Sequence, residues 1–146
     1  MSIRETTAQN ILQALKDIED PRPVLVTREP FEVTELAITQ FPALLVQQTV
    51  ETRETITMGA PGLGRRRGDM TFEIRGFVRG TELDTRRNLL IEAVEAAIDQ
   101  DRYLGQQNQG VIDTQITQIE IVPRLQPLAE FIMTVVVSYN YARGTQ

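Results

Sequence analysis

The strongest constraint on the fold is a pair of alternating segments joined by a loop of glycine and arginine. Residues 43–58 alternate with a period of two and are rich in threonine and valine. Residues 59–68 read GAPGLGRRRG, a run of chain breakers that ends the strand. Alternation resumes over residues 70–79, with large apolar side chains on one face. The pattern predicts one long β-hairpin.

The length of this hairpin raises a packing question. A continuous strand over residues 43–58 would extend about 50 Å, whereas a compact chain of this size has a diameter of about 38 Å. The strand must therefore bend at a bulge, or its distal end must leave the body. Residues 51–57 read ETRETIT and offer little apolar surface for a core. We therefore expect a projecting hairpin arm over about residues 49–72.

The N-terminal part predicts one helix and little other regular structure. Apolar residues recur at helical spacing over residues 6–18, and Thr6 or Thr7 can cap the start of this helix. Residues 24–27 are apolar and β-branched, which predicts a brief strand. Residues 29–42 have proline at both ends and predict an irregular connection with one helical turn.

The C-terminal part predicts a second helix followed by two strands. Thr81 and Asp84 have the spacing of a capping box, and the apolar pattern behind them predicts a helix to about residue 101. Residues 111–122 and 128–141 alternate as strands.

In the first of these strands the apolar residues change parity, which predicts a β-bulge near Thr117 or Gln118. Together the elements predict an α+β fold, namely a mostly antiparallel four-stranded sheet with two main helices packed on one face and a long projecting β-hairpin. We expect residues 1–146 to form a single domain.

The composition argues against most kinds of chemistry. The chain contains neither cysteine nor histidine, which removes the thiolate nucleophile, the commonest general base and the main transition-metal ligands. We therefore expect no enzymatic activity and no catalytic, cofactor-binding or metal-binding residue. No apolar run approaches the roughly 20 residues of a membrane span, so we expect synthesis in the cytoplasm and no membrane partner.

The tip of the hairpin is the most conspicuous candidate for a contact. Gly62, Gly64, Arg65, Arg66 and Arg67 lead into a strand, whereas a phosphate-binding loop needs Lys-Ser or Lys-Thr opening a helix. Three readings stay open: a solvated loop, docking onto an acidic partner, or contact with about three nucleic-acid phosphates. The formal net charge of −5 argues against general nucleic-acid binding.

Three further features carry weaker signals. The strand before the tip, Thr52, Arg53, Glu54 and Thr55, is a possible interface strand, because an unpaired edge of high β-propensity invites pairing with another chain. Fourteen of the fifteen basic residues are arginine, which fits either an interface-rich surface or a compositional bias. Glu92, Glu95 and Asp99 share one side of the second helix and indicate an exposed acidic face.

The order of these elements resembles a known family. A long hairpin ending in FVRG, a helix containing RRNLLIEAVEAAI, and the strand pair QITQIEIVP and FIMTVVVSYNY are similar to the tail terminator (tail completion) proteins of tailed bacteriophages. The resemblance is one of pattern over about residues 6–141, without an invariant motif.

The resemblance implies a homo-oligomeric ring, typically a hexamer, in the tail or neck of a virion assembled in the host cytoplasm. Such a ring caps the tail tube, stops its polymerisation and meets the head-side connector or stopper protein. DNA would pass through the lumen without specific binding, and Gly62, Gly64 and Arg65 to Arg67 would belong to a contacting arm. The long arm and its basic tip depart from the family pattern.

Three alternatives remain. The resemblance also allows another minor tail or head–tail joining protein, and the other two follow from the residues. A second is a nucleic-acid-binding accessory protein that uses Arg65 to Arg67. A third is a carboxylate-dependent hydrolase or isomerase, which would need a buried Asp or Glu with a raised pKa in a pocket.

Overall fold

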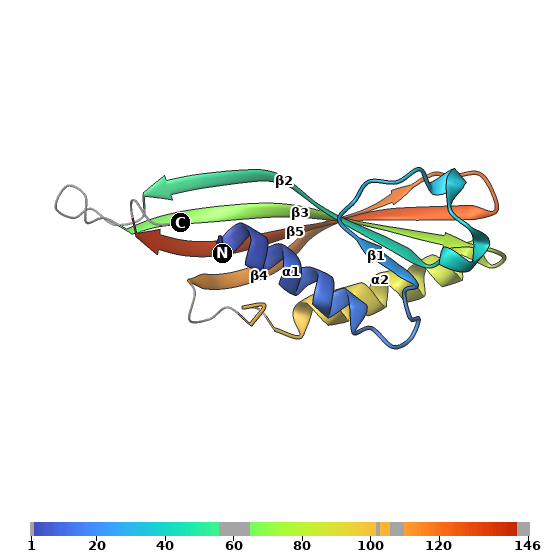
Figure 1. Ribbon diagram of the computed structural model, residues 1–146, viewed down its shortest axis with the longest axis horizontal. Helices are drawn as coiled ribbons and strands as arrows, with labels where there is room; N and C mark the ends of the chain where they lie inside the picture. The colour runs from blue at the N-terminus through green and yellow to red at the C-terminus, as the bar shows by residue number, and fades with distance from the viewer. Residues whose placement is uncertain (1, 56–64, 102, 106–109, 143–146) are drawn as a thin grey trace.

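A long twisted sheet forms the body of the protein in a computed structural model that describes residues 2–55, 65–101, 103–105 and 110–142. Five strands are hydrogen-bonded in the order β1-β2-β3-β5-β4, and two α-helices accompany them (Figure 1). The bounds are α1 Ile3–Lys16, β1 Leu25–Thr27, β2 Ala43–Thr55, β3 Arg65–Arg79, α2 Leu83–Asp99, β4 Val111–Val122 and β5 Leu128–Ala142. Two 3₁₀ turns, η1 Val33–Glu35 and η2 Ile38–Gln40, interrupt the connection from β1 to β2.

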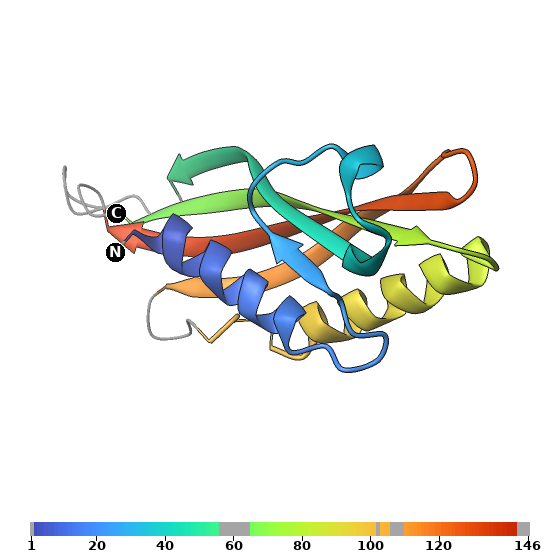
Figure 2. The ribbon, with the colours of Figure 1, turned by 45° about the vertical axis from the view of Figure 1, so that its right-hand side comes forward.

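The predicted α+β class is confirmed, and both helices lie on one face of the sheet (Figures 1 and 2). The predicted count of four strands is wrong. The brief β1 joins the sheet as a fifth strand and pairs in parallel with the start of β2, from Leu25 opposite Ala43 to Thr27 opposite Leu45. A run of three residues does not reveal whether it joins a sheet, because this depends on whether the following connection brings β2 back beside it.

The hairpin of β2 and β3 is confirmed, and in its described part the expected arm over about residues 49–72 is not held by these two strands alone. The two strands pair antiparallel with a register shift between Gln48 and Val50, so the strand bends at a bulge. Strand β3 also pairs with β5 along its whole length, from Arg65 opposite Ala142 to Arg79 opposite Leu128. A third strand of equal length therefore supports the hairpin with its own apolar side chains. The tip at residues 56–64 lies outside the described residues.

The main core lies between the helices and the sheet. Strand β5 contributes the alternating series of fully buried residues that the sequence predicts: Phe131, Met133, Val135, Val137 and Tyr139. Helix α1 contributes Ala8, Ile11 and Leu15, and α2 contributes Leu90, Val94 and Ile98. We call this side of the sheet the helix-bearing face. It extends from β2 to β4. Side chains of this face that the helices do not cover remain exposed at the edges of the sheet.

Both helix starts differ from the prediction. Helix α1 begins earlier than expected, because Ser2 is its N-cap and accepts a hydrogen bond from the Glu5 N–H at 3.2 Å. Helix α2 has Glu82 at its N-cap, in the left-handed region at φ 53°, and no side-chain cap, so the predicted capping box of Thr81 and Asp84 is wrong. The Thr81 carbonyl instead accepts a hydrogen bond from Arg86 Nε at 2.6 Å.

Two glycines of β3 lie beneath aromatic rings of β5. Gly68 is opposite Tyr139 and Gly76 is opposite Phe131 in the register of the two strands. A Cβ atom at Gly68 would lie 2.3 Å from the Tyr139 ring, and one at Gly76 would lie 2.2 Å from the Phe131 ring. Both rings are fully buried. Glycine is therefore required at these positions by the space that the neighbouring rings occupy.

The opposite face carries a smaller core at the end where β2 begins. Val33, Ala43, Leu45 and Phe77 are buried there under the connection between β1 and β2. The rings of Phe31 and Phe77 pack edge to face, with centroids 5.4 Å apart. This cover explains why the connection is ordered around two 3₁₀ turns.

The predicted bulge of β4 is confirmed. The pairing of β4 with β5 shifts register between Ile116 and Gln118, which leaves Thr117 as the extra residue. Beyond it the isoleucines of β4 return to the helix-bearing face, because Ile119 is opposite Met133 and Ile121 is opposite Phe131. The change of the apolar residues from even to odd positions along β4 was therefore enough to predict the bulge.

Candidate assembly surfaces

The distal end of the sheet, where β2 ends and β3 begins, is held by one carboxylate. Glu51 of β2 lies on the helix-bearing face and its side chain is only 12 % exposed. It accepts hydrogen bonds from Arg4 Nε at 2.7 Å, Arg53 Nη2 at 2.9 Å and the Tyr139 hydroxyl at 2.7 Å. The cluster joins the first turn of α1 to β2 and β5. Sequence reasoning missed it, because these residues are far apart in the chain.

The surroundings of Glu51 lower its pKa. Burial raises the pKa, but the hydrogen bonds from Arg4, Tyr139 and Arg53 favour the charged carboxylate more strongly and bring the pKa from 4.5 to about 2. Burial, together with the hydrogen bond to Glu51, raises the pKa of Tyr139. Glu51 therefore carries its charge throughout the neutral range.

The lowered pKa predicts a loss of stability in acid. A carboxylate whose pKa is lower in the folded protein stabilises the fold above its unfolded pKa and ceases to do so as the pH falls through the folded pKa. Between pH 5 and pH 2 we expect Glu51 to account for a loss of about 2 kcal/mol in the free energy of unfolding. Urea unfolding at a series of pH values should show this loss in the wild type and a flatter profile in Glu51→Gln. Identical pH profiles for the two proteins would contradict the assignment.

The predicted tip residues are only partly described. Gly62 and Gly64 lie outside the described residues, and Arg65 and Arg66 are described only through their backbone, which pairs with β5. Arg67 lies 3.5 Å from Asp69 and 3.3 Å from the Ser138 hydroxyl, measured from Nε and Nη2 respectively. Arg67 is therefore engaged by its own chain, and contact of the tip with a partner stays a prediction.

The predicted interface strand forms the end of β2. Thr52 and Arg53 are exposed, and the backbone of Glu54 and Thr55 pairs with β3. On the outer side, the only described strand beside β2 is β1, and β1 reaches no further than Leu45. The outer edge of β2 beyond the bulge is therefore unpaired by any described strand.

Strand β4 forms the other edge of the sheet. Among the described strands it pairs with β5 alone. Ile119 and Ile121 are 38 % and 46 % exposed, although both belong to the helix-bearing face. The helices thus leave the outer part of β4 uncovered.

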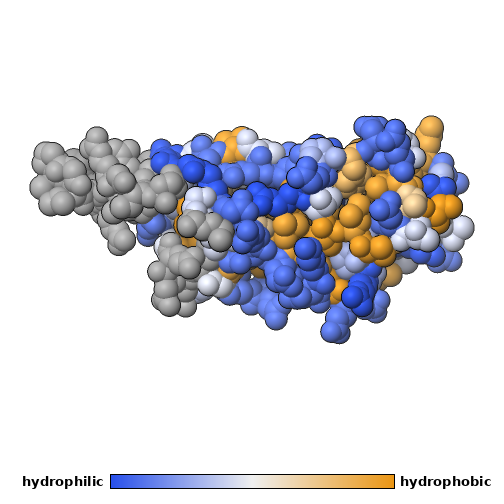
Figure 3. Space-filling model, viewed as in Figure 1, coloured by the Kyte–Doolittle hydropathy of each residue, from blue (hydrophilic) through white to orange (hydrophobic). Residues whose placement is uncertain are grey.

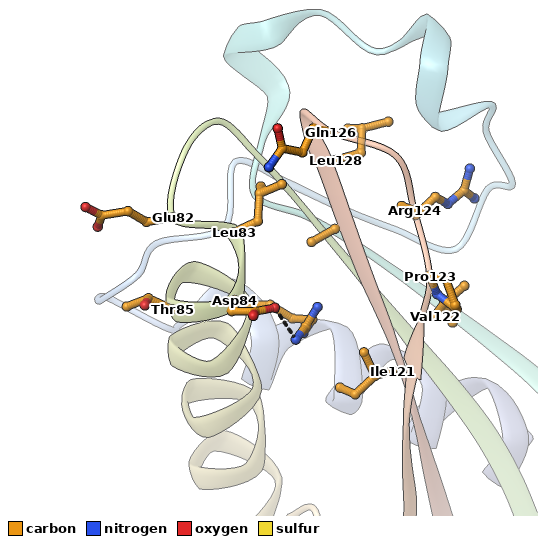
Figure 4. A pocket seen from close by; sticks show the side chains of 12 residues that line it. Glu82, Leu83, Asp84, Thr85, Ile121, Val122, Pro123, Arg124, Gln126 and Leu128 are labelled. Carbon is orange, nitrogen blue, oxygen red and sulfur yellow. Dashed lines mark hydrogen bonds and ion pairs between the residues drawn. The ribbon is translucent and has the colours of Figure 1, made fainter.

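Two separate hollows lie between α2 and β4, and we call them together the α2–β4 groove. Where α2 begins, a hollow of about 650 Å³ separates its first turn from Ile121 and the turn between β4 and β5, and Ile121 points into this space (Figure 4). Asp84 and Arg87 pair across one helical turn there at 2.8 Å. Toward the distal end, a second hollow of about 570 Å³ is lined by Glu95, Asp99 and residues 114–119 of β4.

The face seen in Figure 3 differs in character along its length. The described part of its distal half is mostly hydrophilic, whereas hydrophobic side chains gather where β1 and its connection meet α2. Val24, Ile38 and Leu89 are exposed there, and a hollow of about 360 Å³ lies between the connection and α2. This patch is a further surface available to a partner.

A buried carboxylate occupies the other face of β5. Glu130 is 1 % exposed, and its Oε1 accepts a hydrogen bond from Arg124 Nε at 2.7 Å, while Arg75 lies 3.6 Å from Oε2. Glu130 alternates with the buried apolar residues of β5 and therefore lies on the face away from the main core. Its cationic partners are Arg75 of β3 and Arg124 of the turn between β4 and β5, so no local spacing in the sequence predicts these ion pairs.

The described residues contain no cluster of three or more side chains suited to hold a metal ion. No helix in the described part of the chain is long and apolar enough to cross a membrane.

Comparisons with known proteins find a likeness of fold. No protein-family model and no curated protein matches the chain. Among solved structures, a chain of the virion of a native gene transfer agent particle superposes with a TM-score of 0.51 at 9 % sequence identity. The superposition covers 96 % of this chain and 96 % of that chain. At this identity, the likeness shows a shared fold.

Proposed function

We propose that this chain is a structural protein of a phage-like virion and acts as its tail terminator. In this proposal the chain forms a homohexameric ring, caps the tail tube, stops its polymerisation and joins the tail to the head-side connector. The observation that carries the proposal is the fold shared over nearly the whole chain with a protein of a gene transfer agent virion. The order of elements in the sequence, which resembles that of tail terminator proteins, supports the more specific role.

The surfaces of the protein support a role in assembly. A monomer with two unpaired sheet edges is prone to uncontrolled pairing, whereas a closed ring uses both edges. The formal net charge of −5 suits a lumen through which DNA passes without binding. We propose no catalytic role, because the sequence lacks histidine and cysteine.

The proposal predicts that the purified protein limits the growth of tail tubes. Tail-tube protein from the same virus would be polymerised with and without this chain, and tube lengths would be measured by electron microscopy. We expect shorter tubes, with a ring visible at one end, when enough of this chain is added to supply one ring for each growing tube end. Leu15→Asp, which places a charge at a fully buried position, is a control that should lose this effect. Unchanged tube lengths with folded wild-type protein would contradict the proposal.

A further inference from the structure

The two open edges of the sheet have compatible directions. Each of the pairs β2–β3, β3–β5 and β5–β4 is antiparallel, so β2 and β4 run in opposite directions at the two edges. A second copy in the same orientation, placed beside the first, would therefore bring its β2 antiparallel to β4. Antiparallel pairing would then continue from one sheet into the next.

The edges also lack two of the devices that usually prevent such pairing, although each edge carries a bulge. Neither residues 48–55 nor residues 111–122 contain lysine or proline. Both edges have alternating side chains and β-branched residues that suit a sheet interior.

The register fixes which residues of the two edges lie at the same level. Val50 is opposite Thr71, Thr71 is opposite Val136, and Val136 is opposite Gln115. Glu51 lies at the level of Thr114 in the same way, because Glu51 is opposite Met70, Met70 is opposite Val137, and Val137 is opposite Thr114. An unstaggered neighbour therefore meets the first half of β4 with the outer half of its own β2. The bulge at Thr117 lets the second half of β4 bend away from the neighbour's β1.

Charge favours the same arrangement. Glu95 and Asp99 line the groove beside residues 114–119, and neither forms an ion pair within the part of the chain that the structure describes. On the neighbour, Arg4 and Arg53 lie around Glu51 on the helix-bearing face, where both guanidinium groups bind its carboxylate. At the level of Thr114, these cations would face the acidic groove. In this contact the helix-bearing faces of the two copies lie on the same side, and the arginines of one copy lie near the carboxylates of the other.

We propose that the outer edge of β2 in one copy pairs antiparallel with β4 of the next, with Arg4 and Arg53 facing Glu95 and Asp99 across the α2–β4 groove. The contact joins two different surfaces, so repeating it closes a ring when the rotation per subunit permits. The occupant of the edge is a second copy of this chain. The inference rests on the proposed ring and identifies its subunit contact.

Engineered cysteines test this register directly, because the natural chain has none. In Val50→Cys/Gln115→Cys the two positions of one protomer are three strand spacings apart, about 14 Å, which exceeds the Cα separation of about 7 Å that a disulfide allows. Mild oxidation should therefore join neighbouring protomers only, giving a ladder up to the full ring on a denaturing gel. Val50→Cys mixed with Gln115→Cys should give dimers, and each single variant alone should give none.

Three outcomes would overturn the inference in distinguishable ways. A wild-type ring without cross-links in the double variant would reject this contact and leave the proposed function standing. Cross-links in a single variant alone would show that identical edges meet, and would reject the head-to-tail arrangement. A wild-type protein that stays monomeric at all concentrations, and leaves tube growth unchanged, would reject both proposals.

A charge reversal provides an independent arm. Glu95→Arg/Asp99→Arg should raise the dissociation constant of the ring about tenfold at low salt, with a smaller change at high salt. Glu32→Arg/Glu35→Arg makes the same change of charge on the exposed connection between β1 and β2 and serves as the matched control. Equal effects of the two double variants would contradict the assigned role of the groove.

Discussion

Glu51→Ala is expected to lower the free energy of unfolding by about 2–3 kcal/mol, because the buried Tyr139 hydroxyl and two partly exposed guanidinium groups lose their hydrogen bonds to a charged acceptor. The substitution leaves the Arg4 and Arg53 guanidinium groups and the buried Tyr139 hydroxyl without their shared acceptor. Because the cluster joins α1 to the distal end of the sheet, amide exchange should accelerate first in these segments. Urea unfolding at pH 7 gives the loss of stability, and hydrogen exchange gives its location.

A matched control separates the cluster from the general effect of removing a carboxylate. Glu92→Ala removes the same side chain from an exposed position on α2 and should change the free energy of unfolding by no more than about 0.5 kcal/mol. Equal stabilities for the Glu51 and Glu92 variants would show that the distal cluster contributes nothing.

Gly76→Val is expected to cost about 3 kcal/mol or more, because overpacking a filled core forces side chains and backbone to move. Even the Cβ atom alone would lie 2.2 Å from the fully buried Phe131 ring. Thermal unfolding should show a large fall in Tm, or no folded protein at all.

A second variant keeps this prediction testable if Gly76→Val does not fold. Gly76→Ala adds the Cβ atom alone, and in Gly76→Ala/Phe131→Leu the smaller side chain makes room for it. The double variant should be more stable than the sum of the two single losses predicts, since the residues are in contact. Additive losses would contradict the packing of the Phe131 ring on Gly76.

The sequence predicted those features that depend on periodicity. The hairpin, the buried series of β5 and the bulge at Thr117 follow from the side of the strand on which each apolar residue falls. Periodicity does not say which strands become neighbours. The third strand beneath the hairpin therefore went unpredicted, and with it the reason why Glu51 is held against Tyr139.

The helix starts show a different limit. The spacing of Thr81 and Asp84 suits a capping box, but the chain enters α2 through a left-handed Glu82 after a glycine at φ 131°. The path of the chain out of β3 decides this entry, and local spacing cannot reveal it. The buried Glu130 is a similar case, because one of its cations, Arg75, lies in another strand.

Apolar alternation builds a long sheet, the helices cover one face of it, and two edges remain unpaired by any described strand. Arg4 and Arg53 lie near one edge, and Glu95 and Asp99 lie beside the other, so we infer that copies of the chain can complement one another. A ring that ends tube growth is the function that we propose for such a subunit.

Native mass spectrometry of the purified wild-type chain over a range of concentrations tests the central claim most directly. The account predicts a closed species of six times the 16.5 kDa protomer mass, without an open-ended series of larger assemblies. A protein that remains at the protomer mass at every concentration, including in the presence of tail-tube protein, would contradict it.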